Sequence, residues 1–197
     1  MTSNEKITLR KLLRKKRDHY VRTHDMAKAH QDLLHHVVAG VSLSPGAIIG
    51  GYWPQSSEVD GGFLLSFFHK QGHTCALPVI DLPAKMLVFH KWEPDEALVP
   101  LLVPGHTIPL LIPARCAAVS PTVLLIPVTG FDSQGNRLGQ GGGYYDRTLH
   151  TLRARECITA IGIAFDCQET YTLPQENHDE KMDFIVTPTR LMKFTGD

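Results

Sequence analysis

The sequence has few cysteines, no net charge and no long apolar run. Its four cysteines are scattered and form no C-x-x-C pair, so a zinc site or a disulfide framework is not indicated. No stretch approaches the roughly 18 consecutive apolar residues of a membrane-spanning helix, and the first residues lack the apolar run of a signal peptide. Lys+Arg and Asp+Glu both number 20, so no general attraction to nucleic acids or membranes is expected. These absences predict a monomeric cytoplasmic protein that binds neither nucleic acids nor membranes.

Apolar runs that alternate with helical patterns fill most of the chain. The chain has 197 residues, of which 43% are hydrophobic. This length and composition suffice to bury a core, and one domain spanning 1–197 is predicted. Strands are predicted at 47–53, 75–79, 86–89, 123–126, 158–164 and 184–186, and helices around 7–13 and at 25–39, 63–70 and 144–155. This order favours an α/β fold with a mostly parallel central sheet flanked by helices and an N-terminal helical segment. The continuous apolar run 123–126 favours a central parallel strand covered on both faces. The proline-rich stretch 93–121 is predicted to be irregular.

A glycine-rich segment lies between the predicted strand at 123–126 and the predicted helix at 144–155. Glycine fills every position from 139 to 143 except Gln140. Without Cβ atoms, backbone N–H groups can turn together toward one anion, and the following helix adds its positive dipole end. Arg137 brings a fixed positive charge, and Asp146 is placed to hold a Mg²⁺ that accompanies phosphates. The alternative is a flexible turn without a ligand.

The segment differs from the two commonest phosphate-binding motifs. No Gly-Lys-Ser/Thr closes it, so it is not a P-loop, and Tyr144 stands where a dinucleotide fingerprint has its third glycine. It resembles instead the signature of the 5-formyltetrahydrofolate cyclo-ligase family, through Arg137-Leu138-Gly139-x-Gly141-Gly142-Gly143-Tyr144-Tyr145-Asp146 preceded by Phe131-Asp132-x-x-Gly135. Three weaker elements agree in order and spacing: Lys6-x-x-Leu9-Arg10, Glu58-Val59-Asp60 and Asn177-His178-Asp179.

The resemblance implies an ATP- and Mg²⁺-dependent cyclisation of 5-formyltetrahydrofolate, with or without a polyglutamate tail, to 5,10-methenyltetrahydrofolate. It implies catalytic roles for Arg137 and Tyr144, and Mg²⁺ binding by Asp146 and Asp179. Folate-binding residues would be Trp53, Glu58, Gln140, Gly141, Gly142, Gly143 and Tyr144. ATP-binding residues would be Lys6, Arg10, Arg137, Leu138, Gly139, Gln140, Gly141, Gly142, Gly143, Tyr144 and Tyr145. Gln140 departs from the aromatic or basic residue that often fills its site in the family.

Several of these residues have a plainer alternative. Lys6 and Arg10 share one helix face by their i,i+4 spacing, but a basic helix face is often only solvated. We predict that solvated role for Lys11, Arg14, Lys15, Lys16 and Arg17. Trp53 fits either a stacking role on the pterin ring or core packing, and one of Tyr144 and Tyr145 could pack beneath the loop.

Two other functions compete with the cyclo-ligase interpretation. A phospho-metabolite isomerase on a similar α/β scaffold would use the same anion loop, and it would turn over without ATP. A non-catalytic nucleotide-binding module would use the loop to hold nucleotide and the basic first helix to contact RNA or a partner protein, with binding that falls steeply with salt.

Overall fold

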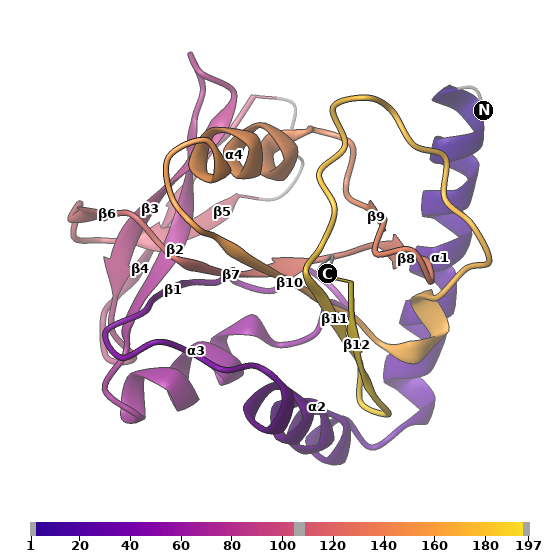
Figure 1. The fold of residues 1–197 in the computed structure, drawn as a ribbon, viewed down its shortest axis with the longest axis horizontal. Coiled ribbons are helices and arrows are strands. Elements are labelled where there is room, and N and C mark those ends of the chain that lie inside the picture. Colours follow the sequence, from indigo (N-terminus) through magenta and orange to yellow (C-terminus); the bar gives the residue numbers. More distant parts are fainter. Residues whose placement is uncertain (1–2, 105–108, 195–197) are drawn as a thin grey trace.

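Within the described residues, 3–104 and 109–194, an eight-stranded sheet forms the centre of the fold (Figure 1). In this computed structural model the strands lie in the order β12-β11-β10-β7-β1-β2-β3-β6. The strands from β11 to β2 run parallel, and β12, β3 and β6 add antiparallel pairs at the two sides. The prediction of an α/β fold with a mostly parallel sheet is therefore confirmed. The strand bounds are β1 Ile48–Gly50, β2 Thr74–Asp81, β3 Met86–Trp92, β6 Ala118–Val119, β7 Val123–Pro127, β10 Thr159–Ile163, β11 Phe184–Val186 and β12 Leu191–Lys193.

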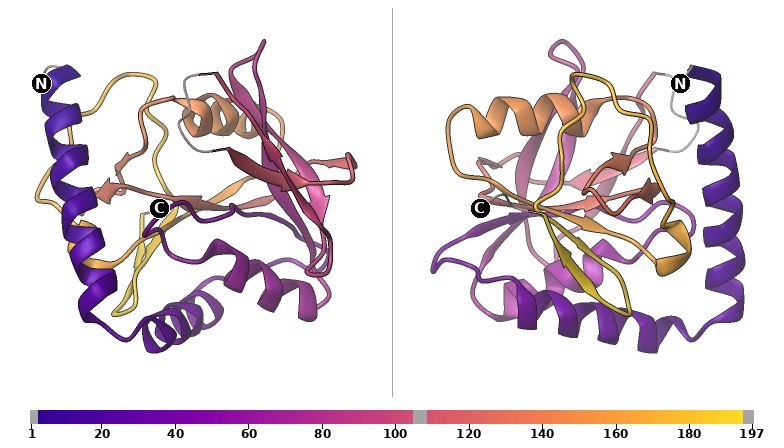
Figure 2. Two further views of the ribbon diagram at one scale, coloured as in Figure 1. Left: turned by 180° about the vertical axis from the view of Figure 1, so that it is seen from behind. Right: turned by 45° about the vertical axis from the view of Figure 1, so that its right-hand side comes forward.

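Helices cover both faces of this sheet. In Figure 1, α2 (Met26–Gly40) and α3 (Gly61–Lys70) lie below it, and α4 (Tyr144–Arg153) lies above it. Both views of Figure 2 place α1 (Ser3–Thr23) along one side of the molecule. In the part of the chain that the structure describes, no helix combines the length and apolar character needed to cross a bilayer.

The central strand β7 explains why two helical layers form. Val123 and Leu125 belong to the apolar cluster that contains the buried side chains of α2 and α3. Leu124 and Ile126 point the other way and pack in the cluster that contains Leu149 of α4. Because side chains alternate along a strand, a continuous apolar run needs a cover on each face. The predicted two-sided burial of this strand is confirmed.

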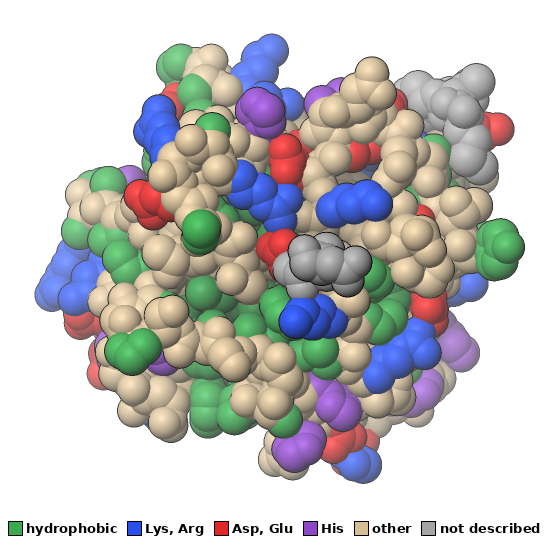
Figure 3. Space-filling view, in the orientation of Figure 1, with side chains coloured by type: hydrophobic (Ala, Val, Ile, Leu, Met, Phe, Trp, Pro, Cys, Tyr) green, Lys and Arg blue, Asp and Glu red, His purple; other side chains and the backbone are tan. Residues whose placement is uncertain are grey.

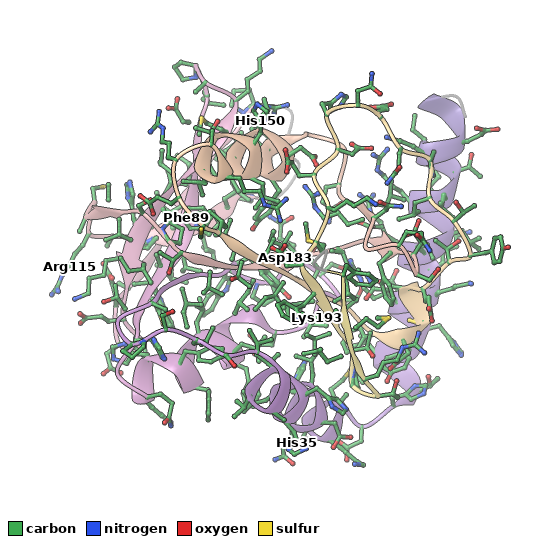
Figure 4. The ribbon with its side chains drawn as sticks, in the orientation of Figure 1. His35, Phe89, Arg115, His150, Asp183 and Lys193 are labelled. Atoms are coloured by element: carbon green, nitrogen blue, oxygen red, sulfur yellow. The ribbon has the colours of Figure 1, made fainter. Side chains whose placement is uncertain are left out.

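Side-chain caps and one buried contact set the positions of the helices. The carboxylate of Asp25 accepts a hydrogen bond from the N–H of Lys28 (3.1 Å) and begins α2, and Asp60 does the same for α3 through the N–H of Phe63 (3.1 Å). At the far end of α4, Asp183 accepts hydrogen bonds from Arg153 (2.9 Å) and from the N–H of Ala160 on β10 (2.7 Å). Figure 4 labels Asp183 near the middle of the view, beneath α4.

The prediction of irregular structure over 93–121 is wrong. There β4 (Leu98–Leu101) and β5 (Leu110–Pro113) pair antiparallel, and β6 adds to β3 at the edge of the main sheet. A two-stranded ladder has open edges, so Pro100 and Pro113 cost it few hydrogen bonds. Leu101 and Leu110 pack against the core on the α4 side, which gives the hairpin its apolar anchor.

The strand order creates a crevice at the carboxyl ends of β1 and β7. From β1 the chain passes through α3 to β2 on one side, and from β7 it passes through α4 to β10 on the other side. Since β1 and β7 are neighbours, the two connections leave in opposite directions and on opposite faces. Ligands of open α/β sheets bind at such a switch point.

Candidate active site

A tight hairpin after β7 positions Arg137. Strands β8 (Gly130–Phe131) and β9 (Arg137–Leu138) pair with each other. The turn between them is held by the buried carboxylate of Asp132, which accepts hydrogen bonds from the backbone N–H groups of Gln134 (3.0 Å), Asn136 (3.1 Å) and Leu173 (3.0 Å). With the Asn136 side-chain amide, which donates to the same carboxylate at 2.9 Å, these donors fill the roughly four acceptor positions of the carboxylate and hold the turn rigid, so Arg137 leaves it in a defined direction.

The glycine loop then enters α4 in a conformation that favours glycine. Gly141 has φ +107° and Gly143, the N-cap of α4, has φ +65°, values that side chains with a Cβ rarely adopt. Arg10 of α1 donates from Nε to the carbonyl of Gly139 at 2.8 Å. None of the described residues accepts a hydrogen bond from the backbone N–H groups of Gly141, Gly142 or Gly143. These donors at a helix N-terminus form an anion-binding arrangement.

A cavity of about 680 Å³ opens beside this loop. Its wall combines the glycine loop, the segment after β1, the start of α1, the segment around Asp179 and apolar side chains of β4 and β5. Every residue predicted for the site lines it: Lys6, Arg10, Trp53, Glu58, Arg137, Leu138, Gly139, Gln140, Gly141, Gly142, Gly143, Tyr144, Tyr145, Asp146 and Asp179. The fold thus brings together residues from both ends of the chain.

Each predicted metal carboxylate is paired with a predicted phosphate-binding cation. Arg137, only 4% exposed, contacts Asp146 at 2.8 Å and donates to the carbonyl of Glu180 at 2.8 Å. Lys6 contacts Asp179 at 3.2 Å. At this end of the cavity the carboxylates of Asp146 and Asp179 therefore balance the charges of Arg137 and Lys6, and a bound phosphate would compete with the carboxylates for the same cations.

The donor set around Asp179 fits a hard divalent cation. The ligand atoms of Glu176, His178 and Asp179 lie within 4.8 Å of one another, and Asp146 lines the same cavity. Mg²⁺ takes oxygen ligands and usually needs only one or two protein carboxylates beside phosphate oxygens and water. Asp146 and Asp179 bring two carboxylates to the wall of one cavity, while Glu176 and His178 are exposed.

At the other end, Trp53 and Glu58 follow β1. Trp53 is 36% exposed, and its ring centroid lies 6.3 Å from that of Trp92, so it both packs on the core and keeps a free surface. The Glu58 carboxylate accepts hydrogen bonds from the N–H of Gln55 (3.0 Å) and from the side-chain amide of Gln140 (2.9 Å). The side-chain amide oxygen of Gln140 accepts in turn from Arg14.

Two tyrosines of the cavity wall, Tyr52 and Tyr145, are held in their neutral form. Burial raises the pKa of the Tyr145 phenol, and the nearby Glu58 carboxylate raises it further. Tyr52 donates from its hydroxyl to the carbonyl of Val59 at 2.8 Å, and burial also raises its pKa. Tyr144 packs against the loop, with the guanidinium carbon of Arg147 5.5 Å from its ring centroid. A neutral phenol can donate or accept a hydrogen bond toward a ligand.

Arg17 corrects the prediction of a solvated basic face. Its side chain is only 4% exposed and lies 3.8 Å from the Glu58 carboxylate. Arg14 is a second correction, because it is half-buried and donates a hydrogen bond to the side chain of Gln140 in the glycine loop. Lys11, Lys15 and Lys16 are exposed as predicted. Helical spacing could have predicted the burial of Arg17, because positions 6, 10, 13 and 17 fall on one helix face. On that face Leu13 is buried and packs close to Gly130 of β8.

Fold and cavity together define an α/β protein with an anion-binding loop at its topological switch point. The sequence profile of the 5-formyltetrahydrofolate cyclo-ligase family matches residues 2–188. The 5-formyltetrahydrofolate cyclo-ligase of Escherichia coli K12 is 32% identical over 138 residues, 70% of this chain and 75% of the relative. That of Haemophilus influenzae is 28% identical over 157 residues, with coverages of 77% and 81%. The chain belongs to the 5-formyltetrahydrofolate cyclo-ligase family.

A solved structure agrees with the fold. The solution structure of 5,10-methenyltetrahydrofolate synthetase from Aquifex aeolicus superimposes with a TM-score of 0.73, at 22% identity, over 98% of this chain and 94% of the other. This similarity supports the α/β architecture.

Proposed function

We propose that this protein catalyses the ATP-driven cyclisation of 5-formyltetrahydrofolate to 5,10-methenyltetrahydrofolate, with release of ADP and phosphate. The observation that carries the proposal is one cavity that brings together Trp53, Glu58 and the N–H groups of Gly141–Gly143, for which the described part of the chain offers no acceptor. One end offers donors and cations for phosphates, and the other offers a ring and a carboxylate for a pterin. Family membership points to the same reaction.

The phosphate end accounts for ATP as a substrate. Backbone donors at a helix N-terminus bind phosphate oxygens without any side chain, and Lys6, Arg10 and Arg137 surround the loop with positive charge. Asp146 and Asp179 would hold the Mg²⁺, which when bound neutralises charge on the phosphates.

The pterin end accounts for the acceptor. A carboxylate such as Glu58 accepts hydrogen bonds from the N–H edge of a pterin, and the exposed part of the Trp53 indole can stack on its rings. Tyr144 follows the glycine loop and lines the same cavity, and in this proposal it orients the formyl group. The apolar side chains Pro100, Leu110 and Leu111 of the β4–β5 hairpin close the wall.

The chemistry requires positioning and no covalent protein intermediate. The formyl oxygen attacks the γ-phosphorus of ATP, and ADP leaves. N10 then attacks the formyl carbon and loses its proton, and the carbon–oxygen bond breaks with its electrons going to the departing phosphate. Holding both substrates in line and neutralising the developing charge are sufficient contributions from the loop and from Arg137. A monomer, a cytoplasmic location and a polyglutamylated substrate stay predictions.

The test mixes purified protein with 5-formyltetrahydrofolate, Mg²⁺ and ATP and follows methenyltetrahydrofolate by its near-ultraviolet absorbance. We expect ATP-dependent product, and a loss of roughly 10²- to 10³-fold in turnover for Arg137→Ala and Asp146→Asn. The matched control is Asp95→Asn, which removes an exposed carboxylate that does not line the cavity. This variant should behave as wild type. A folded wild-type protein that binds ATP and forms no product would refute the proposal.

A further inference from the structure

Arg17 is a buried cation that does not touch the cavity. Its Nε donates to the hydroxyl of Ser57 at 3.0 Å, and its Nη1 lies 3.8 Å from Oε1 of Glu58. The side chains of Arg17 and Glu58 are 4% and 7% exposed. Burial lowers the pKa of the Arg17 guanidinium, and the carboxylates of Glu58 and Asp18 oppose this. A guanidinium removed from water requires such partners.

Glu58 is held from three directions by three parts of the chain. Arg17 approaches from α1, the N–H of Gln55 donates to Oε2 from the segment after β1, and the amide of Gln140 donates to Oε1 from the glycine loop. A carboxylate oxygen has two lone pairs, so positions remain for donors from a ligand in the cavity. Among the described residues that line the cavity, Glu58 is present and Arg17 is not.

We infer that Arg17 is a positioning residue for the reaction, which fixes the Glu58 carboxylate from behind so that it meets the N–H edge of the pterin. The inference rests on the proposed function, in which Glu58 binds the pterin. Without Arg17, a nearly buried carboxylate would lack its cation and would turn toward water. The pterin donors would then lose their acceptor, although no atom of Arg17 contacts the substrate.

The geometry distinguishes arginine from lysine at this position. The Nε of Arg17 donates a hydrogen bond to Ser57, its Nη1 forms an ion pair with Glu58, and the Ser57 hydroxyl donates in turn to Asp18. A lysine carries one point charge with rotatable donors, and it lacks the planar fork of a guanidinium that fixes the directions of both contacts. Arg17→Lys therefore keeps the charge but loses the fixed orientation.

The experiment is a double-mutant cycle with Arg17→Ala and Glu58→Gln. The four proteins are compared by KM for 5-formyltetrahydrofolate, KM for ATP and binding of 5-formyltetrahydrofolate by calorimetry. We expect Arg17→Ala to weaken folate binding roughly tenfold and to change the KM for ATP by less than about twofold. In the Glu58→Gln background the same substitution should change folate binding by less than about twofold. Arg17→Lys should lie between wild type and Arg17→Ala.

Lys15→Ala is the matched control, because it removes an exposed cation from the same helix, and it should match wild type. The inference would be overturned if Arg17→Ala weakened folate binding equally with Glu58 and with Gln at position 58. It would also be overturned if Arg17→Ala raised the KM for 5-formyltetrahydrofolate and the KM for ATP in parallel, or if it left folate binding unchanged. If Arg17→Ala does not fold, Arg17→Lys takes its place in the cycle under the same criteria. Failure of the proposed function is separate: the wild-type protein would show no ATP-dependent product, or Glu58→Gln would bind folate as wild type does.

Discussion

The substitution Gly141→Ala tests whether the backbone shape of the glycine loop binds the phosphates. At φ +107° the new side chain would be strained, and its Cβ would lie 3.3 Å from the guanidinium carbon of Arg10. Backbone strain of this kind costs about 1–3 kcal/mol. Moving Arg10 would also weaken its 2.8 Å hydrogen bond to the carbonyl of Gly139, and a hydrogen bond to a charged group contributes about 1.5–3 kcal/mol.

The loop borders an open cavity, so we expect it to relieve part of this strain by turning its N–H groups away from the phosphate position. A loss of about 2 kcal/mol in ATP binding corresponds to roughly a 30-fold weaker affinity. Calorimetric titration with a non-hydrolysable ATP analogue measures it directly, and kcat/KM for ATP should fall by a similar factor.

Gly46→Ala is the matched control. Gly46 has φ +77°, and no atom lies within 4 Å of the position that its Cβ would take. Both variants should therefore unfold at a temperature lower by about 2–8 °C, but only Gly141→Ala should lose affinity for the nucleotide. If Gly141→Ala binds and uses ATP as wild type does, the reasoning about the loop's backbone is wrong.

Three further predictions concern stability and reactivity. Leu125→Ala, in the fully covered strand β7, should lower the free energy of unfolding by about 2–5 kcal/mol in urea titrations, whereas Leu102→Ala, at a side chain 79% exposed, should change it by less than about 0.5 kcal/mol; equal effects would contradict the assigned core. Burial raises the pKa of Cys75 to about 12, so iodoacetamide at pH 8 should label exposed Cys116 rapidly and Cys75 only after unfolding, as mass spectrometry of the peptides can show. Burial lowers the pKa of His30, which in its neutral form accepts a hydrogen bond from the N-cap N–H of α3. The contribution of His30 to stability is present above the ordinary histidine pKa and is lost as pH falls through the lowered value. The free energy of unfolding of the wild type should therefore fall more than that of His30→Gln between about pH 7 and pH 5. Equal pH dependence of the two unfolding free energies would contradict this.

Much of the fold was predictable because it depends on short-range patterns. The apolar run 123–126 predicted a strand covered on both faces, and Leu124 and Leu125 do pack into opposite layers. Polar residues such as Asp60 cap the helices that follow them. The hairpin of β4 and β5 was missed because its prolines suppress the strand signal, and its pairing depends on a partner segment and on burial, which local patterns do not contain.

The site was predictable in its membership but not in its pairings. The glycine loop and the residues at Trp53 and Glu58 were identified from motif and spacing, and all of them line the cavity. The buried role of Arg17 was not predicted. From sequence alone, a helix face with several cations is predicted to be solvated unless the acid that pairs with one of them is known. Glu58 is the acid that pairs with Arg17, and it lies beside Arg17 only because α1 packs against the segment after β1.

The sequence by itself determined the local structural features: the loop conformation that favours glycine, the helix that follows it and the alternation of strands and helices. These depend on backbone sterics and on neighbours within a few residues. Tertiary structure alone decided the strand order, which places β1 beside β7 and opens the crevice. It also decided that Lys6 meets Asp179 across 173 positions of the chain, and that Gln140 meets Glu58 across 82. The physical reason is that such contacts form only when burial of the two apolar layers brings distant segments together.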